Sequence, residues 1–182
     1  LFIGMDIHKK TWSVHLRTDL FDHKGFSMPA EPVKLADYVG NHFADHDVSL
    51  TYEAGCCGFS AARYFLNLGW TVKVVNPNDV PRIDKQLYQK TDTLDCRNLC
   101  KQLQQGQLHG IYIPTEPEEQ LKSLLRQRNQ VVKQLRKAKS HIKGLLLYHG
   151  IAIPEQFDNP TWSHDFVDWL KTIQWSHITG TA

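Results

Sequence analysis

Short apolar runs alternate with polar stretches over the first 115 residues, in a pattern typical of an α/β domain. Residues 1–7 form an apolar run, and residues 12–16 alternate between apolar and polar with a period of two, so both are predicted strands. The same reasoning predicts strands at about residues 25–28, 47–53 and 71–75, helices at 31–43, 61–68 and 91–105, an extended segment at 108–113 and a connecting loop at 80–90.

The order strand–helix–strand between residues 47 and 75 predicts a βαβ unit, which makes part of the sheet parallel. We therefore expect an α/β fold with a mixed sheet and flanking helices.

The longest periodic stretch runs from residue 116 to residue 149. Apolar residues recur three or four positions apart from Leu121 to Leu146, which predicts one helix. A helix of ~33 residues is ~50 Å long, too long to lie wholly on a small domain. We expect it to pair with another helix, in a coiled coil or a helical hairpin. A shorter helix is expected over residues 162–175, so the expected parts are residues 1–115, 116–150 and 151–182.

Basic residues gather in this long segment, although the whole chain has a formal net charge of only +2. With 41% hydrophobic and 22% charged residues, its composition is that of an ordinary globular protein. Residues 120–143 hold eight of the 21 basic residues and none of the 19 acidic ones, so the rest of the chain is net acidic. This asymmetry predicts a polyanion partner. The predicted nucleic-acid-binding residues are Lys122, Arg126, Arg128, Lys133, Arg136, Lys137, Lys139 and Lys143.

An alternative explanation is that these cations form the solvated face of a coiled coil. Coiled coils usually mix charge signs at their flanking positions, however, and no acid occurs between residues 120 and 154.

Four acids occupy positions where a strand ends or a helix starts. Asp6 and Glu53 end predicted strands, while Asp92 and Asp95 lie three residues apart at a helix start and so share one face. In sheets with parallel strands, such positions converge on one crevice. Clustered carboxylates repel one another and suit hard cations, and two ions ~4 Å apart can serve phosphodiester displacement. We therefore predict a site for Mg²⁺ or Mn²⁺.

Each acid also has an ordinary structural explanation. Asp92 and Asp95 suit the N-cap and N3 positions of a helix, Asp6 suits a turn, and Glu53 suits a strand end. His8 follows Asp6 by two residues and is a candidate supporting residue.

The four cysteines form two close pairs, Cys56 with Cys57 and Cys96 with Cys100. This spacing indicates neither a disulfide framework nor a CxxC zinc site. We expect small buried thiols in a reducing cytosol.

Three segments together resemble the DEDD transposases of bacterial insertion sequences. They are Gly4-Met5-Asp6, Tyr52-Glu53-Ala54-Gly55 and Thr91-Asp92-Thr93-Leu94-Asp95, and the resemblance covers roughly residues 2–150. That family is related to the Piv-type DNA invertases, and its amino-terminal domain is similar to Holliday-junction resolvases. The resemblance therefore implies a ribonuclease H-like fold, followed by a long helical extension.

The resemblance also implies a function. It assigns Asp6, Glu53, Asp92 and Asp95 as catalytic, metal-binding residues for DNA cleavage and strand exchange. It implies that the long basic helix supports a homo-oligomer and contacts nucleic acid, either DNA or the structured guide RNA that some relatives use. Family members carry a serine nucleophile in a second domain, which we expect beyond Ala182. We therefore expect the amino-terminal half of a recombinase, incomplete by itself.

The sequence is also compatible with two other functions. An actin-like ATPase half also opens with a Gly-x-Asp strand and a hairpin, although the chain lacks a Gly-rich phosphate loop. A non-catalytic module for oligomerisation and nucleic-acid binding would leave the acids structural. No apolar run approaches the ~18 residues that cross a bilayer, and no signal peptide is visible, so we expect a cytoplasmic bacterial protein without a membrane partner.

Overall fold

A mixed five-stranded sheet forms the centre of the amino-terminal unit in this computed structural model, which describes residues 1–80 and 92–174, without the side chains of residues 92 and 93. The strands, in their order across the sheet, are β3 (Phe26–Pro29), β2 (Thr11–Arg17), β1 (Phe2–Ile7), β4 (Ser49–Glu53) and β5 (Thr71–Val75). The central strand β1 pairs antiparallel with β2 and parallel with β4, while β3 and β5 form the edges.

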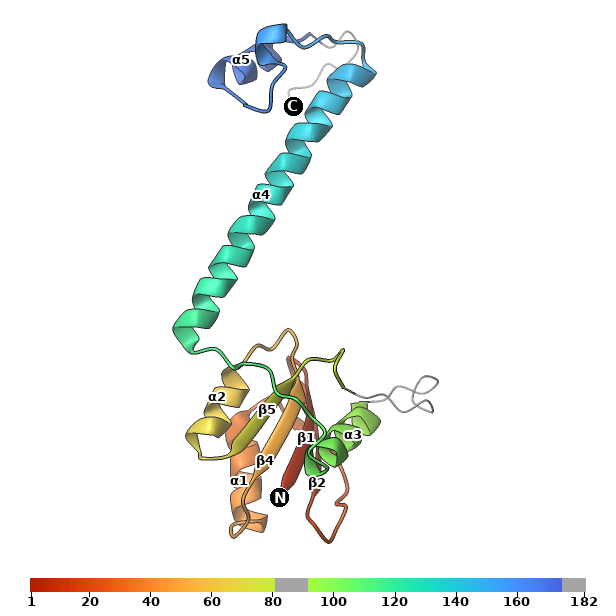
Figure 1. The fold of residues 1–182 in the computed structure, drawn as a ribbon, viewed down its shortest axis with the longest axis vertical. Helices are drawn as coiled ribbons and strands as arrows, with labels where there is room; N and C mark the ends of the chain where they lie inside the picture. Colours follow the sequence, from red (N-terminus) through yellow and green to blue (C-terminus); the bar gives the residue numbers. More distant parts are fainter. Residues whose placement is uncertain (81–91, 175–182) are drawn as a thin grey trace. The chain divides into compact units, whose positions relative to one another are not determined.

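Helices cover both faces of this sheet (Figure 1). The helices α1 (Pro32–His42) and α2 (Ser60–Asn67) lie on one face, and α3 (Asp92–Gln104) lies on the other. This arrangement confirms the predicted α/β, ribonuclease H-like fold. The long predicted helix is also present, as α4 (Glu116–Tyr148).

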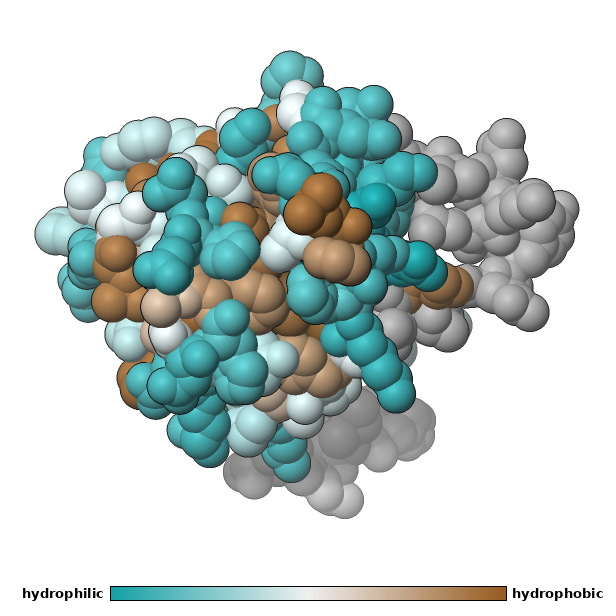
Figure 2. Space-filling model, turned by 90° about the horizontal axis from the view of Figure 1, so that it is seen from below, coloured by the Kyte–Doolittle hydropathy of each residue, from teal (hydrophilic) through white to brown (hydrophobic). Residues whose placement is uncertain are grey.

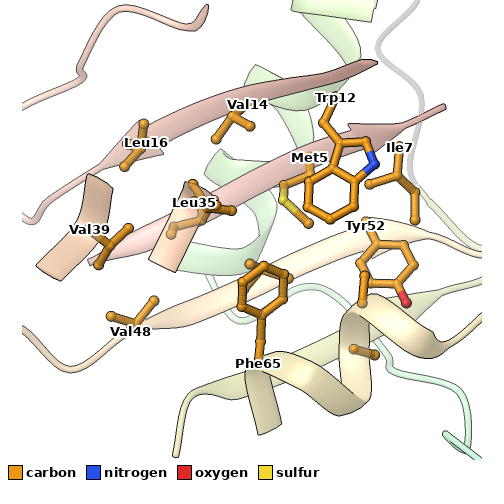
Figure 3. Packing of buried hydrophobic residues seen from close by; sticks show 14 of the residues in the cluster. Met5, Ile7, Trp12, Val14, Leu16, Leu35, Val39, Val48, Tyr52 and Phe65 are labelled. Atoms are coloured by element: carbon orange, nitrogen blue, oxygen red, sulfur yellow. The ribbon is translucent and has the colours of Figure 1, made fainter. Parts of the chain in front are cut away.

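The face covered by α1 and α2 holds the larger core. Side chains alternate along a strand, so Met5 on β1 and Trp12 on β2 point toward Leu35 of α1 and Phe65 of α2 (Figure 3). The Phe65 ring is fully buried and lies 6.4 Å from the Trp12 ring, between ring centroids. Removing this apolar surface from water is the main stabilising contribution on this side.

The opposite face brings the backbone of α3 unusually close to β1. A Cβ atom added to Gly4 would lie 2.6 Å from the amide nitrogen of Cys100 and closer still to the carbonyl oxygen of Cys96. The two cysteines are buried there, and their thiols donate to the carbonyl oxygens of Ser13 and Phe2. Only glycine leaves room for this contact.

A second contact of α3 is polar and joins it to β2 and the segment that follows β2. The ring Nε2 of buried His15 lies 2.6 Å from one carboxylate oxygen of Asp22, and Arg97 of α3 donates to the other oxygen through Nε at 3.1 Å. These partners lower the pKa of Asp22, chiefly through the hydrogen bond with His15. The Asp22 carboxylate is therefore bonded to a residue of α3 that lies 75 positions further along the chain.

The second unit comprises residues 121–182 and contains most of α4. After α4, the chain continues into a short 3₁₀ helix (Glu155–Phe157) and α5 (His164–Thr172). Phe166 is fully buried, and its ring centroid lies 5.0 Å from that of Trp162 and 5.6 Å from that of Trp169. Ser163 caps α5 by accepting a hydrogen bond from the Phe166 amide.

Several details differ from the sequence predictions. The last helix is shorter than residues 162–175, because Trp162 precedes it and packs its ring against Phe166. The segment 108–113 forms a single bridge to β5 at Gly110. Cys96 and Cys100 are buried as predicted, but Cys56 is exposed because it lies in the turn before α2. The predicted loop at 80–90 falls outside the described residues, apart from Val80.

The outer surface of the first unit mixes residue types. Figure 2 shows hydrophobic residues interspersed among hydrophilic ones at the end of the sheet where β1 begins. Within residues 1–80 and 92–174, no helix combines the length and apolar character needed to cross a membrane.

We expect Gly4→Ala to lower the free energy of unfolding by about 1–3 kcal/mol, the usual effect of overpacking a tight contact. The new methyl group would push α3 away from β1. Urea denaturation measures the change, and Gly40→Ala in α1 is the matched control because its added Cβ meets nothing within 4 Å. An equal effect of both substitutions would contradict the close contact.

We also expect the Asp22 cluster to make stability depend on pH. The pKa of Asp22 is lowered in the folded chain from its usual 3.8, so its contribution is fully present well above pH 3.8 and is lost as the pH falls through the folded value. The difference in unfolding free energy between the native chain and Asp22→Asn should therefore be fully present at about pH 5 and shrink below about pH 4. Urea titrations at pH values from about 5 to well below 4 measure it, and a difference that is the same at all of them would contradict the assignment.

Candidate active site and nucleic-acid interface

The acids Asp6 and Glu53 lie side by side at the ends of two neighbouring parallel strands. Met5 pairs with Tyr52 in the register of β1 and β4, so Asp6 and Glu53 are the next residues along. Neighbouring strands lie ~4.8 Å apart. Because side chains alternate, both carboxylates belong to the face that carries Gly4 and α3.

The start of α3 brings another acid, Asp95, near Asp6. Asp95 precedes Cys96, whose carbonyl oxygen lies against Gly4 two residues before Asp6. The pKa of the Cys96 thiol is raised to about 12, mainly by burial, and the nearby carboxylates of Asp6 and Asp95 contribute to this shift. Both acids therefore lie close to one thiol. Asp92 is the first residue of α3, and its side chain lies outside the description.

Polar and sulfur groups surround Asp6. The Nε2 atom of His8 lies 3.3 Å from one Asp6 carboxylate oxygen, and the Asp6 side chain is 27% exposed. Cys57 donates through its thiol to the Ile7 carbonyl oxygen, and burial, with added effects of Cys56 and Asp6, raises its pKa. His8 therefore lies beside Asp6, and its supporting role stays a prediction.

The chemistry of these side chains suits a hard cation, because carboxylate oxygens are the ligands such cations prefer. Among the described side chains, which exclude that of Asp92, no group of three or more His, Cys, Asp or Glu residues is arranged to hold a metal ion. The assignment of all four acids as ligands therefore stays a prediction.

Two charged residues near this site were missed by the sequence analysis. Arg63 of α2 and Glu119 of α4 form an ion pair with an N–O distance of 2.7 Å, beside the turn that follows Glu53. They are 56 positions apart in the chain. Local periodicity relates only near neighbours, so the sequence alone offers no signal for this pair.

The predicted nucleic-acid-binding residues all lie on α4, but they are not equivalent. Lys139 and Lys143 are partly buried in the second unit, where Lys143 donates to the Asn159 carbonyl oxygen at 2.9 Å and Lys139 lies over the Trp162 ring. The six with exposed side chains are Lys122, Arg126, Arg128, Lys133, Arg136 and Lys137.

Comparison with known proteins gives one consistent family. Residues 3–150 match the model of a transposase family, the IS110-type DEDD transposases. The chain is 29% identical over 130 residues to y4qE of Sinorhizobium fredii, whose name describes it as a transposase. It is 25% identical over 156 residues to the transposase for insertion sequence element IS1328 of Yersinia enterocolitica.

These alignments cover most of this chain and a smaller part of each relative. They include 71% and 84% of the chain, but only 32% of the first relative and 44% of the second. The chain therefore spans less than half the length of the curated relatives that it matches. Because the family model covers most of the sequence, from the first strand to the end of α4, the chain belongs to the IS110-type DEDD transposase family.

Proposed function

We propose that this chain is the amino-terminal catalytic part of a transposase that cleaves and exchanges DNA strands with bound Mg²⁺ or Mn²⁺. The observation that carries the proposal is the adjacent register of Asp6 and Glu53 beside the start of α3, in a chain of this family. The proposed ligands are Asp6, Glu53, Asp92 and Asp95.

Electrostatics support a cation at this position. Carboxylates held on neighbouring strands repel each other, and a divalent cation between them removes that cost. When bound, such ions would stabilise the charge that develops on the attacking and leaving oxygens of a phosphodiester. The chain itself would orient Asp6 through His8 and keep neutral thiols beside the acids, because the pKa of Cys96 is about 12.

The complete reaction needs more than these residues. The family resemblance implies a serine that links covalently to DNA, and the matched relatives are more than twice as long as the segment they share with this chain. We propose that, in proteins of this family, the serine belongs to a part that the shared segment does not include. This chain alone is then not expected to complete strand transfer.

We also propose that α4 binds nucleic acid and pairs with a second copy of itself. Its apolar residues recur at helical spacing and are largely exposed within the second unit, as in Leu124 at 69% and Leu135 at 53%. Self-association would bury this stripe. It would also bring two acid-free basic segments together, so a polyanion such as DNA or a guide RNA should stabilise the pair.

Replacing a proposed ligand should weaken metal binding. We expect calorimetric titration with Mn²⁺ to show binding to the native chain and binding weaker by more than about tenfold in Asp6→Asn and Glu53→Gln, because each variant loses a ligand charge. Asp37→Asn, an exposed acid on α1, is the matched control. Absence of binding, or equal affinity in all variants, would leave the chain as a non-catalytic nucleic-acid-binding module.

Replacing exposed cations of α4 should weaken nucleic-acid binding and its dependence on salt. Replacing Lys133, Arg136 and Lys137 with glutamine should weaken binding to duplex DNA or RNA and lower the slope of log affinity against log salt by up to ~0.9 per lost phosphate contact. Lys143→Gln is the control, and its change in slope per replaced residue should be smaller, since Lys143 already bonds to Asn159. Fluorescence anisotropy at several salt concentrations measures the slope.

Light scattering on the same samples reports whether two chains share one nucleic acid. A binding affinity that does not vary with salt would indicate that the basic face of α4 contacts protein, and a single chain per nucleic acid would contradict the proposed pairing.

A further inference from the structure

The turn after Glu53 is held by a residue that lies far away in the sequence. The chain leaves β4 at Glu53 and enters α2 at Ser60. The residue before α2, Phe59, has no side-chain hydrogen bond to cap the helix. Its amide instead donates to the Oε1 atom of Glu119 at 3.3 Å. A carboxylate at this position satisfies an amide at the start of α2 and complements the helix dipole.

The same carboxylate pairs with a cation on α2. The Arg63 guanidinium donates to the Oε2 atom of Glu119 at 2.7 Å and to the Pro114 carbonyl oxygen at 3.0 Å. Their side chains are 25% and 28% exposed. A partly buried, charge-assisted pair of this kind resists solvent screening better than an exposed one.

Gly58 makes the approach of Glu119 possible. Its φ of +64° is one that side chains rarely adopt, and an added Cβ would lie 2.7 Å from Glu119 Oε1. The Gly58 carbonyl oxygen accepts a hydrogen bond from the Tyr52 hydroxyl at 3.3 Å. Tyr52 is fully buried and immediately precedes Glu53. The turn is therefore joined to β4 on one side and to Glu119 on the other.

A different acid caps α4 itself. Glu118 accepts hydrogen bonds from the Thr115 amide at 2.8 Å and the Thr115 hydroxyl at 2.9 Å. The amino-terminal turn of α4 therefore has its own capping contact, and the bonds of Glu119 to Phe59 and Arg63 are additional to it. All of these residues belong to the first unit, residues 1–120.

We propose that Glu119 and Arg63 are positioning residues, which hold the turn between Glu53 and α2 and thereby fix the Glu53 carboxylate relative to Asp6. The inference rests on the proposed metal-binding function of Glu53. In addition, the first turn of α4 would help to hold the proposed metal site through Glu119. One continuous helix would then carry both this positioning residue and the exposed basic residues.

The test uses Glu119→Gln and Glu119→Ala in the 182-residue chain, with Glu116→Gln as the matched control. Glu116 lies in the same turn, and its carboxylate accepts a hydrogen bond from the Gln120 side chain within α4. Hydrogen exchange of a peptide covering residues 54–59 reports the turn, and Mn²⁺ titration reports the site. Thermal unfolding of each variant is measured first, so that hydrogen exchange and Mn²⁺ titration are made at a temperature at which every variant is folded.

We expect faster exchange at residues 54–59 and Mn²⁺ affinity lower by about tenfold in both Glu119 variants, the usual effect of removing a residue that orients a metal ligand. Glu116→Gln should match the native chain in both measurements. Unchanged exchange would overturn the proposal, as would faster exchange with unchanged Mn²⁺ affinity, since Glu119 would then have a merely structural role.

Mn²⁺ binding by the native chain distinguishes failure of the positioning role from failure of the proposed metal-binding function. Absence of Mn²⁺ binding in the native chain would overturn the metal-binding function, and with it the positioning role. Binding by the native chain together with unchanged binding in the Glu119 variants would overturn the positioning role alone.

Discussion

The contact between the backbone of α3 and the central strand β1 is the constraint on which the site depends. It exists because residue 4 has no side chain, which lets the carbonyl oxygen of Cys96 and the amide of Cys100 lie directly over the strand. Hydrogen bonds from the two cysteine thiols to strand carbonyl oxygens then hold the helix in place. Since Asp95 precedes Cys96, the same contact brings the start of α3 to Asp6.

Around Asp6, the carboxylates carry negative charge and the neighbouring thiols do not. The neighbouring thiols of Cys57 and Cys96 have raised pKa values, mainly because burial disfavours their charged forms. They remain neutral where a thiolate would add to the repulsion. The Nε2 atom of His8 lies 3.3 Å from an Asp6 carboxylate oxygen. This distribution of charge is suited to a cation that approaches from solvent, because Asp6 is partly exposed.

The long helix α4 has two distinct regions. Its first turn is fastened to α2 through Glu119 and Arg63 and belongs to the first unit. The region after residue 120 exposes both apolar and basic side chains. Because helices in proteins are stabilised mostly by packing an apolar face, this exposed face is suited to a further contact. In the proposed function, this exposed region is completed by nucleic acid and a second copy of the chain, while the first turn supports the turn beside Glu53.

Hydrophobic periodicity along the sequence predicted most of the elements and their order, because it depends on which side of each strand or helix is buried. It also indicated that Asp6, Glu53 and Asp95 lie at strand ends and a helix start. Tertiary structure alone decided what these residues contact. The pairing of Arg63 with Glu119, the bond between Arg97 and Asp22, and the need for glycine at position 4 arise between segments far apart in the chain. Local patterns carry no information about such contacts, since sheet order and helix placement determine them.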